Sequence, residues 1–181
     1  MRSNATKLPP MLEALHAEGP HPGLAGKLRL FGQFVGSWDV EVINYLSDGS
    51  RRVMDAEWHF GWVLEGRAIQ DVWIAPRRGM RRQSSDEWGD YGTTLYFFDL
   101  ELGAWRSTWI GPCKGYVKPF IARPVGNEIV LEGAFMPGSL SRFIFSEITP
   151  DSFHGRHLES RDDWASQVLH QEMHARRRSY A

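Results

Sequence analysis

Residues 34–42 read Phe34-Val35-Gly36-Ser37-Trp38-Asp39-Val40-Glu41-Val42 and open a run in which apolar and polar side chains alternate. Such alternation is the period of a β-strand that buries one face and exposes the other. Gly36 lacks a Cβ, so the strand can bend there or another segment can approach closely. Trp38 adds a large apolar side chain with one N–H donor. We therefore expect either the closed floor of an antiparallel barrel at Trp38 or an ordinary first strand with a buried tryptophan.

A second alternating run covers residues 54–64 and is the clearest strand signal in the chain. Its apolar positions are Met54, Ala56, Trp58, Phe60, Trp62 and Leu64. Six consecutive alternations do not fit the helical period. If the tryptophans point inward, Glu57 and His59 lie on the outside. An Asp48-Gly49 turn joins this run to the first one as a hairpin.

Eight further strands follow at a similar spacing, with glycine, proline or aspartate at the turns. They are predicted at residues 67–75, 91–100, 104–111, 116–124, 127–135, 139–149, 152–160 and 164–176. Ten strands without helical crossovers predict an all-β fold, a single up-and-down antiparallel barrel of about ten strands. We expect residues 1–30 to form a tail and short helices that pack on the barrel, and residues 31–178 to form the barrel domain.

Composition narrows the class of protein. The chain has 181 residues and a formal net charge of −1, which suits one domain and provides no overall field that would attract nucleic acid or an anionic membrane. We expect neither nucleic acid nor a membrane as a partner. The composition leaves open whether the chain forms a homodimer. Cys113 is the only cysteine, so no intrachain disulfide can form. No apolar stretch of signal-peptide length follows Arg2 and Lys7, so we expect a cytoplasmic protein.

The opening Gly36-Ser37-Trp38 strand resembles that of the calycin superfamily, which includes lipocalins, fatty-acid-binding proteins and nitrobindins. A closer resemblance, over about residues 30–178, is to a family of uncharacterised bacterial lipocalin-like domains. Its matching segments are Trp62-Val63-Leu64-Glu65-Gly66-Arg67, Tyr91-Gly92-Thr93-Thr94-Leu95, residues 105–112 and residues 148–153. The resemblance implies a calycin barrel and carries no settled function. Val40 and Val42 replace the later glycines of the nitrobindin motif, which argues against haem binding.

The aromatic strands suggest where a ligand would lie. A small barrel leaves room for one ligand, and walls rich in tryptophan suit a flat apolar or aromatic molecule. Binding of such a small hydrophobic or aromatic molecule is the leading function. The predicted ligand-binding residues are Trp58, Phe60, Trp62, Trp73, Tyr96, Trp109 and Arg67. The alternative is that the aromatic side chains fill the barrel completely and the protein serves as a dimerising module.

The last predicted hairpin carries the residues most suited to chemistry. With Asp162-Asp163 as a two-residue turn, His157 pairs with Val168, and one face holds five polar residues. These are His157, Glu159, His170, Glu172 and His174. His170, Glu172 and His157 are the candidate catalytic residues of a cofactor-free isomerase, cyclase or hydratase that moves protons. The alternatives are a solvated outer face and a haem or metal site through a histidine of the last strand.

Residues 76–90 interrupt the strand rhythm. The segment holds four arginines, Arg77, Arg78, Arg81 and Arg82. Such a loop can guide an anionic ligand to the mouth of a barrel or can simply be solvated. The chain has no Gly-x-Ser-x-Gly, phosphate loop or dinucleotide fingerprint, which argues against covalent hydrolases and nucleotide enzymes.

Overall fold

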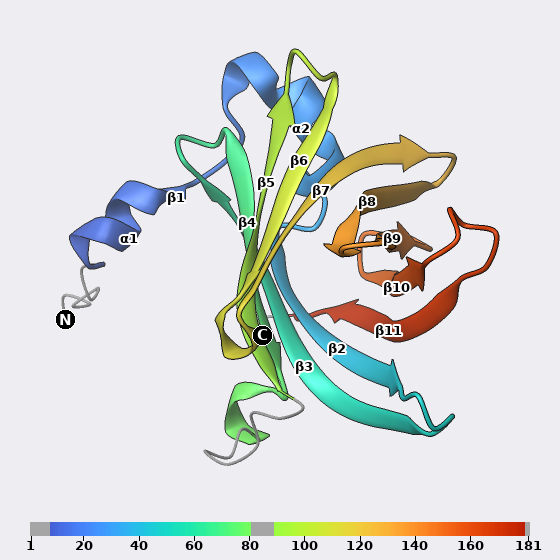
Figure 1. The fold of residues 1–181 in the computed structure, drawn as a ribbon. Coiled ribbons are helices and arrows are strands. Elements are labelled where there is room, and N and C mark those ends of the chain that lie inside the picture. Colours follow the sequence, from blue (N-terminus) through green and yellow to red (C-terminus); the bar gives the residue numbers. More distant parts are fainter. Residues whose placement is uncertain (1–7, 81–88, 180–181) are drawn as a thin grey trace.

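The computed structural model describes residues 8–80 and 89–179, with the backbone alone at 135 and 136, and its strands form one closed barrel (Figure 1). The barrel strands are β2 (Gly36–Tyr45), β3 (Arg51–Val63), β4 (Ala68–Ala75), β5 (Asp90–Asp99), β6 (Ala104–Gly111), β7 (Tyr116–Val125), β8 (Glu128–Met136), β9 (Ser139–Ser146), β10 (Ser152–Ser160) and β11 (Val168–Arg177). The other elements are α1 (Pro10–Leu15), β1 (His16–Ala17), η1 (Pro22–Leu24), α2 (Ala25–Gly32), η2 (Arg78–Met80) and η3 (Pro112–Lys114).

The strands follow one another around the barrel in chain order. Each strand from β2 to β10 pairs antiparallel with the next, and β11 pairs back with β2. The predicted up-and-down barrel of ten strands is confirmed. The last strand begins at Val168 instead of residue 164, because residues 161–167 form a longer connection in which Asp163 and Trp164 have φ of 53° and 67°.

Helix α2 covers one end of the barrel, which we call the closed end (Figure 1). Its Leu28 and Phe31 are fully buried, and the Phe31 ring stacks on Tyr96 at a centroid distance of 4.5 Å. Trp38 is also fully buried, and its indole N–H donates to the Phe34 carbonyl at 2.7 Å. As expected for the floor of a barrel, Trp38 is a packing residue.

Arg177 ties the last strand to this end. Its guanidinium lies 4.1 Å from the centre of the Trp38 ring. It donates hydrogen bonds to three backbone carbonyl oxygens, those of Gln33, Val35 and Pro150, at 2.8, 2.8 and 2.6 Å. Gly36 makes this approach possible. Its φ is +130°, and a Cβ there would lie 2.6 Å from Arg177 Nη1.

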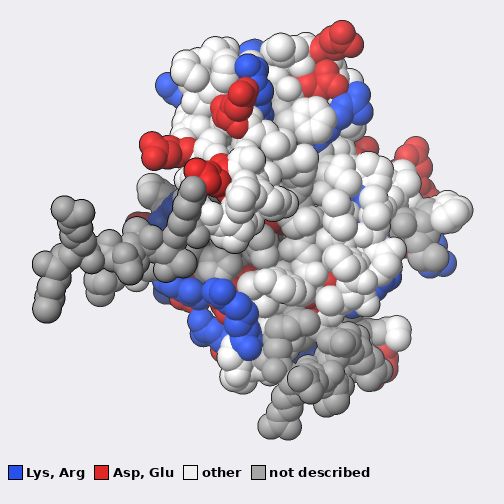
Figure 2. Space-filling model, turned by 90° about the vertical axis from the view of Figure 1, so that its left-hand side faces the viewer, with Lys and Arg blue, Asp and Glu red and all other residues white. Residues whose placement is uncertain are grey.

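The opposite end, which we call the open end, carries the connections β2–β3, β4–β5, β6–β7, β8–β9 and β10–β11. Helix α1 stands beside the barrel with no buried residue, and β1 adds to the edge of β3, where His16 faces Val63 (Figure 1). On the face shown in Figure 2, acidic and basic side chains lie near one another around a broad area without either. Among the described residues, no helix combines the length and apolar content needed to cross a membrane.

Candidate functional site

A cavity of about 380 Å³ occupies the lumen and reaches the open end. Aromatic and aliphatic side chains from the middle of the strands form its deeper wall, among them Trp58, Trp73, Tyr96, Phe120, Leu131 and Phe143. Polar side chains surround it nearer the open end, among them Asn44, Asp90, Lys118, His157, Glu159 and His170. The aromatic residues of the barrel therefore do not fill it, contrary to the alternative of a completely packed interior.

Four of the predicted ligand-binding residues line this cavity: Trp58, Trp73, Tyr96 and Trp109. Trp58 and Trp73 face each other across β3 and β4, with ring centroids 5.0 Å apart and planes at 76°. Trp109 lies against the backbone of Gly92, where a Cβ would come within 2.5 Å of the indole ring. A glycine at this position is what lets the Trp109 ring turn inward over β5.

The other three predicted residues lie toward the closed end. Successive inward residues of a strand are about 7 Å apart, so β3 carries its later aromatic residues away from the cavity. Phe60 packs 5.7 Å from Phe34, and Trp62 lies over Gly32 of α2. Arg67 is exposed in the β3–β4 turn, where its guanidinium is 3.3 Å from Glu65.

The register of β10 and β11 differs from the predicted one. His157 lies opposite Gln171 instead of Val168, a shift of three residues. Because side chains alternate along a strand, an odd shift exchanges the inward and outward residues of β11 relative to β10. The connection of residues 161–167, which is longer than the predicted two-residue turn, accounts for two residues of the shift, and a β-bulge beside His157 adds the third.

The candidate catalytic residues consequently fall on two sides of the barrel wall. His157 lines the cavity. Glu172 points outward, where the Tyr45 hydroxyl donates to its carboxylate. His170 is the extra residue of a β-bulge in β11, and the bulge brings its side chain to the cavity as well.

A histidine–carboxylate pair lies at the open end of the cavity. His170 Nε2 is 3.1 Å from Glu159 Oε2, and the His157 ring is 5.7 Å from the His170 ring. His157 Nε2 is 2.8 Å from the Ser141 hydroxyl. Burial, followed by the charges of His170 and Lys118, lowers the pKa of His157 to about 4. His157 is therefore neutral near pH 7.

Two polar residues of the lining, Lys118 and Ser107, were not singled out in the sequence. Lys118 is nearly buried, its ammonium is 3.7 Å from the centre of the Tyr116 ring, and burial lowers its pKa to about 8. Ser107 is buried, and its hydroxyl has no hydrogen-bond partner among the described residues. Lys118, Phe120 and Ala122 are alternate residues of β7 and so lie on the same face of the strand. This pattern could have predicted that the Lys118 side chain points into the barrel.

Asp71 is the most deeply buried ionisable residue next to the cavity. Its carboxylate accepts hydrogen bonds from the Thr94 backbone N–H at 2.6 Å and from the Tyr96 hydroxyl at 2.8 Å. Burial raises the pKa of Asp71 to about 6 against the effect of these hydrogen bonds, and burial also raises the pKa of Tyr96. The burial of Asp71 could have been predicted from the sequence, because Asp71 lies at alternate positions with the apolar Ile69 and Trp73.

The described part of the arginine-rich segment lies on the outer wall. Arg78 binds Glu57 through its backbone N–H and its guanidinium, both at 2.8 Å. The guanidinium holds the pKa of the Glu57 carboxyl at about 2. Arg77 pairs with Asp39 at 2.8 Å. Arg81 and Arg82 lie outside the described residues, and the guiding role of the segment stays a prediction.

The comparisons with known proteins concern the fold. No protein-family model matches the chain, and no curated protein matches it either. Six solved chains match. One is the S-type phycobiliprotein lyase CPES from Guillardia theta, with a TM-score of 0.55 and 11% sequence identity, over 84% of this chain and 92% of that one. At this identity the similarity shows the fold alone, which is a closed antiparallel up-and-down barrel.

Proposed function

We propose that the barrel binds a small, largely apolar or aromatic molecule in its lumen and admits it through the open end. The observation that carries this proposal is the cavity of about 380 Å³ with aromatic walls and a polar mouth. Sites for small molecules typically have volumes of roughly 300–1,000 Å³ and combine apolar walls with a few polar groups.

The polar groups support a bound molecule with a polar end. Lys118, His157 and His170 surround the mouth, where a carboxylate, hydroxyl or carbonyl of a ligand could accept or donate hydrogen bonds. The buried Ser107 hydroxyl lacks a partner among the described residues, and leaving such a group unsatisfied costs free energy. A ligand atom that reaches Ser107 would remove that cost.

The structural neighbour also supports a function for this fold. It is named as a phycobiliprotein lyase, so a barrel of this fold can carry an activity. Its substrate is not carried over to this chain at 11% identity. The ligand class proposed here rests on the lining residues.

A fluorescence titration tests the proposal, because three tryptophans, Trp58, Trp73 and Trp109, line the cavity. We expect saturable quenching by 2-naphthoic acid and by 2-naphthalenemethanol, and no saturable change with sucrose. The acid and the alcohol differ only in the polar end, so their relative affinity reports how strongly the polar residues of the mouth favour a carboxylate. If neither naphthalene probe saturates, the lumen does not bind this class of molecule.

A second candidate function is proton transfer on the bound molecule, which the contact of 3.1 Å between His170 and Glu159 favours. The carboxylate would orient the imidazole and stabilise its protonated form, as a general base requires. Glu159 then has the role that was predicted for Glu172.

Deuterium exchange tests this second function. A carbonyl compound that binds in the lumen should exchange its α-hydrogen in D₂O, with the rate followed by NMR. We expect His170→Gln to slow the exchange at least tenfold and His174→Gln, which changes an outward histidine of the same strand, to leave it unchanged. Equal rates for the two variants would remove His170 from the proposed chemistry.

A further inference from the structure

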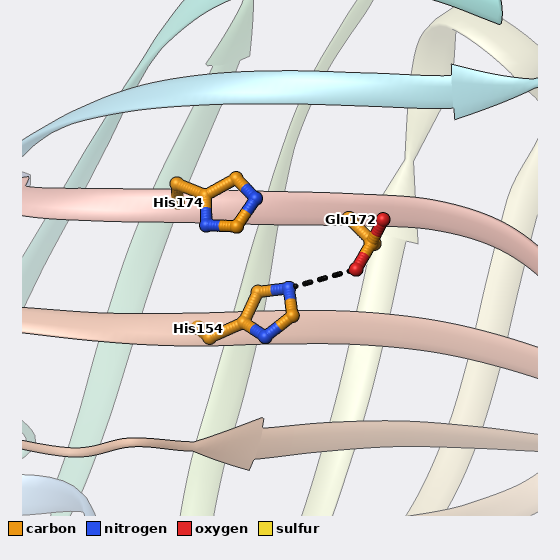
Figure 3. Close-up of side chains that lie close together, drawn as sticks. All are labelled: His154, Glu172 and His174. Carbon is orange, nitrogen blue, oxygen red and sulfur yellow. Dashed lines mark ion pairs between the residues drawn. The ribbon is translucent and has the colours of Figure 1, made fainter.

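The outer surface of the last hairpin holds a second group of titratable side chains, separate from the cavity. His154 of β10 and His174 of β11 lie opposite each other, and Glu172, two residues before His174, lies on the same face of β11 (Figure 3). We propose that these three side chains bind a divalent transition-metal ion of the zinc type. The site lies on the opposite face of the wall from His157, so it is independent of the lumen.

The geometry brings three ligand atoms together. One ligand atom from each residue lies within 4.8 Å of the other two. The imidazole rings are stacked, with centroids 4.5 Å apart and planes at 5°. In a tetrahedral zinc site the ligand atoms are roughly 3.3 Å apart, as follows from zinc–ligand distances of about 2.0–2.1 Å. Rotation of the exposed His174 side chain, with small adjustments of the partly buried His154 and Glu172, would close the remaining distance.

The polar atoms at the centre of this group are incompletely satisfied. His154 Nε2 is 3.1 Å from Glu172 Oε1, yet the contact lacks hydrogen-bond geometry, and this nitrogen has no other partner among the described residues. Figure 3 shows the Glu172 carboxylate and ring nitrogens of both histidines turned toward the same space. An ion placed there would bind the free nitrogen and the carboxylate at once.

The surroundings suit a cation. The Tyr45 hydroxyl holds the second oxygen of Glu172, which is the kind of supporting hydrogen bond that fixes a metal ligand. Glu41 lies opposite His174 on β2, and Glu147 acts electrostatically on His154. Among the described residues, Arg156 is the only other cationic group, besides His174, that acts electrostatically on His154. Its guanidinium is paired with Glu128 at 2.6 Å.

The donor set selects the class of ion. Two imidazoles and one carboxylate suit zinc, iron, cobalt or nickel better than calcium or magnesium, which prefer oxygen alone. His174 is exposed, so water can occupy the remaining coordination position. A site with three protein ligands and one open position has the composition of known zinc centres that bind or activate a further molecule.

Titration of the purified, metal-free chain tests the site. We expect one Zn²⁺ per chain by calorimetry, and with Co²⁺ a visible absorption spectrum that Zn²⁺ abolishes by competition. His174→Ala should weaken Zn²⁺ binding at least tenfold, and Glu172→Gln should do the same. Because His174 is exposed, its replacement should leave the fold intact, which circular dichroism checks.

His170→Ala is the matched control, because it removes a histidine of the same strand that also lies 3.1 Å from a glutamate. We expect it to bind Zn²⁺ as the unaltered chain does. Absence of stoichiometric Zn²⁺ binding would overturn the proposal. So would a loss of binding in His170→Ala with normal binding in His174→Ala, because the ion would then lie in the lumen.

Discussion

The closed and open ends of the barrel are built from the same ten strands and from similar aromatic residues, yet one is packed and the other is hollow. At the closed end the rings fill space against each other, as Phe31 does on Tyr96 and Trp105 at 4.5 and 4.9 Å. Toward the open end lies the cavity, which has Trp58 and Trp73 in its deeper wall and is also lined by Trp109. In this barrel, inward tryptophans line a cavity only where helix α2 and its neighbouring rings do not fill the space in front of them.

The two ends also differ in how their polar groups are satisfied. Arg177 donates to three carbonyl oxygens at the closed end. Toward the open end, Ser107 lacks a partner among the described residues, and burial displaces the pKa values of His157 and Lys118. Satisfied polar groups stabilise a fold, whereas unsatisfied and perturbed ones are typical of functional sites.

The largest expected effect comes from removing one tryptophan at each end. Trp38→Ala should lower the free energy of unfolding by about 4 kcal/mol, because a fully buried ring is lost. Trp109→Ala should cost about 2 kcal/mol, because this ring is only partly buried beside an existing cavity. Urea denaturation measures both values. Equal costs would contradict the contrast between a packed end and a hollow one.

The buried carboxyl of Asp71 predicts a dependence of stability on pH. The folded state keeps its proton up to pH about 6, whereas the unfolded chain loses it near pH 3.8. Ionisation of Asp71 therefore lowers the free energy of unfolding as pH rises through this window, by at most about 3 kcal/mol. Asp71→Asn removes this contribution.

The stability of Asp71→Asn relative to the unaltered chain should consequently increase from pH 4 to pH 6 and stay constant above pH 7. Denaturation curves at a series of pH values provide the comparison. Other groups, such as His157 and Glu57, titrate in both proteins and cancel in the difference. A difference that does not vary with pH would mean that Asp71 is ionised throughout.

A smaller effect is expected from adding one methyl group to the backbone of the closed end. Gly36→Ala should cost about 2 kcal/mol, because φ is +130° and the new Cβ would displace Arg177. Gly61→Ala is the control, since it lies in β3 with nothing within 4 Å of the new Cβ, and it should change stability little. If Gly36→Ala is as stable as Gly61→Ala, Arg177 does not hold the closed end.

Alternation, together with the regularly spaced turn residues, was sufficient to predict the barrel. Trp38 and Trp58 lie opposite each other in β2 and β3, as two alternating runs joined by the Asp48-Gly49 turn require. Local pattern determines which face of such a strand is buried, so the inward positions of β3 followed from the sequence. The interaction of Arg177 with residues more than 100 positions away could not be predicted from the sequence, because no local pattern encodes it.

The candidate site was harder to predict, because it depends on the register of one hairpin. The connection of residues 161–167 and the bulge at His170 together decide that His157 and His170 share the lumen while Glu172 does not. Turn length and bulges change the register by single residues, and each odd change exchanges the two faces. The group of His154, Glu172 and His174 arises from the same shift, so it too required the structure.

The most direct test of the central claim is the affinity of 2-naphthoic acid for two single variants of β6. Ser107→Leu places a larger side chain in the cavity, and Thr108→Leu makes a similar enlargement at the neighbouring position, whose side chain points to the opposite face of the strand. We predict at least a tenfold loss of affinity for Ser107→Leu and none for Thr108→Leu, measured by tryptophan quenching. Equal affinity in both variants and the unaltered chain would show that the probe binds elsewhere and that the lumen is not the binding site.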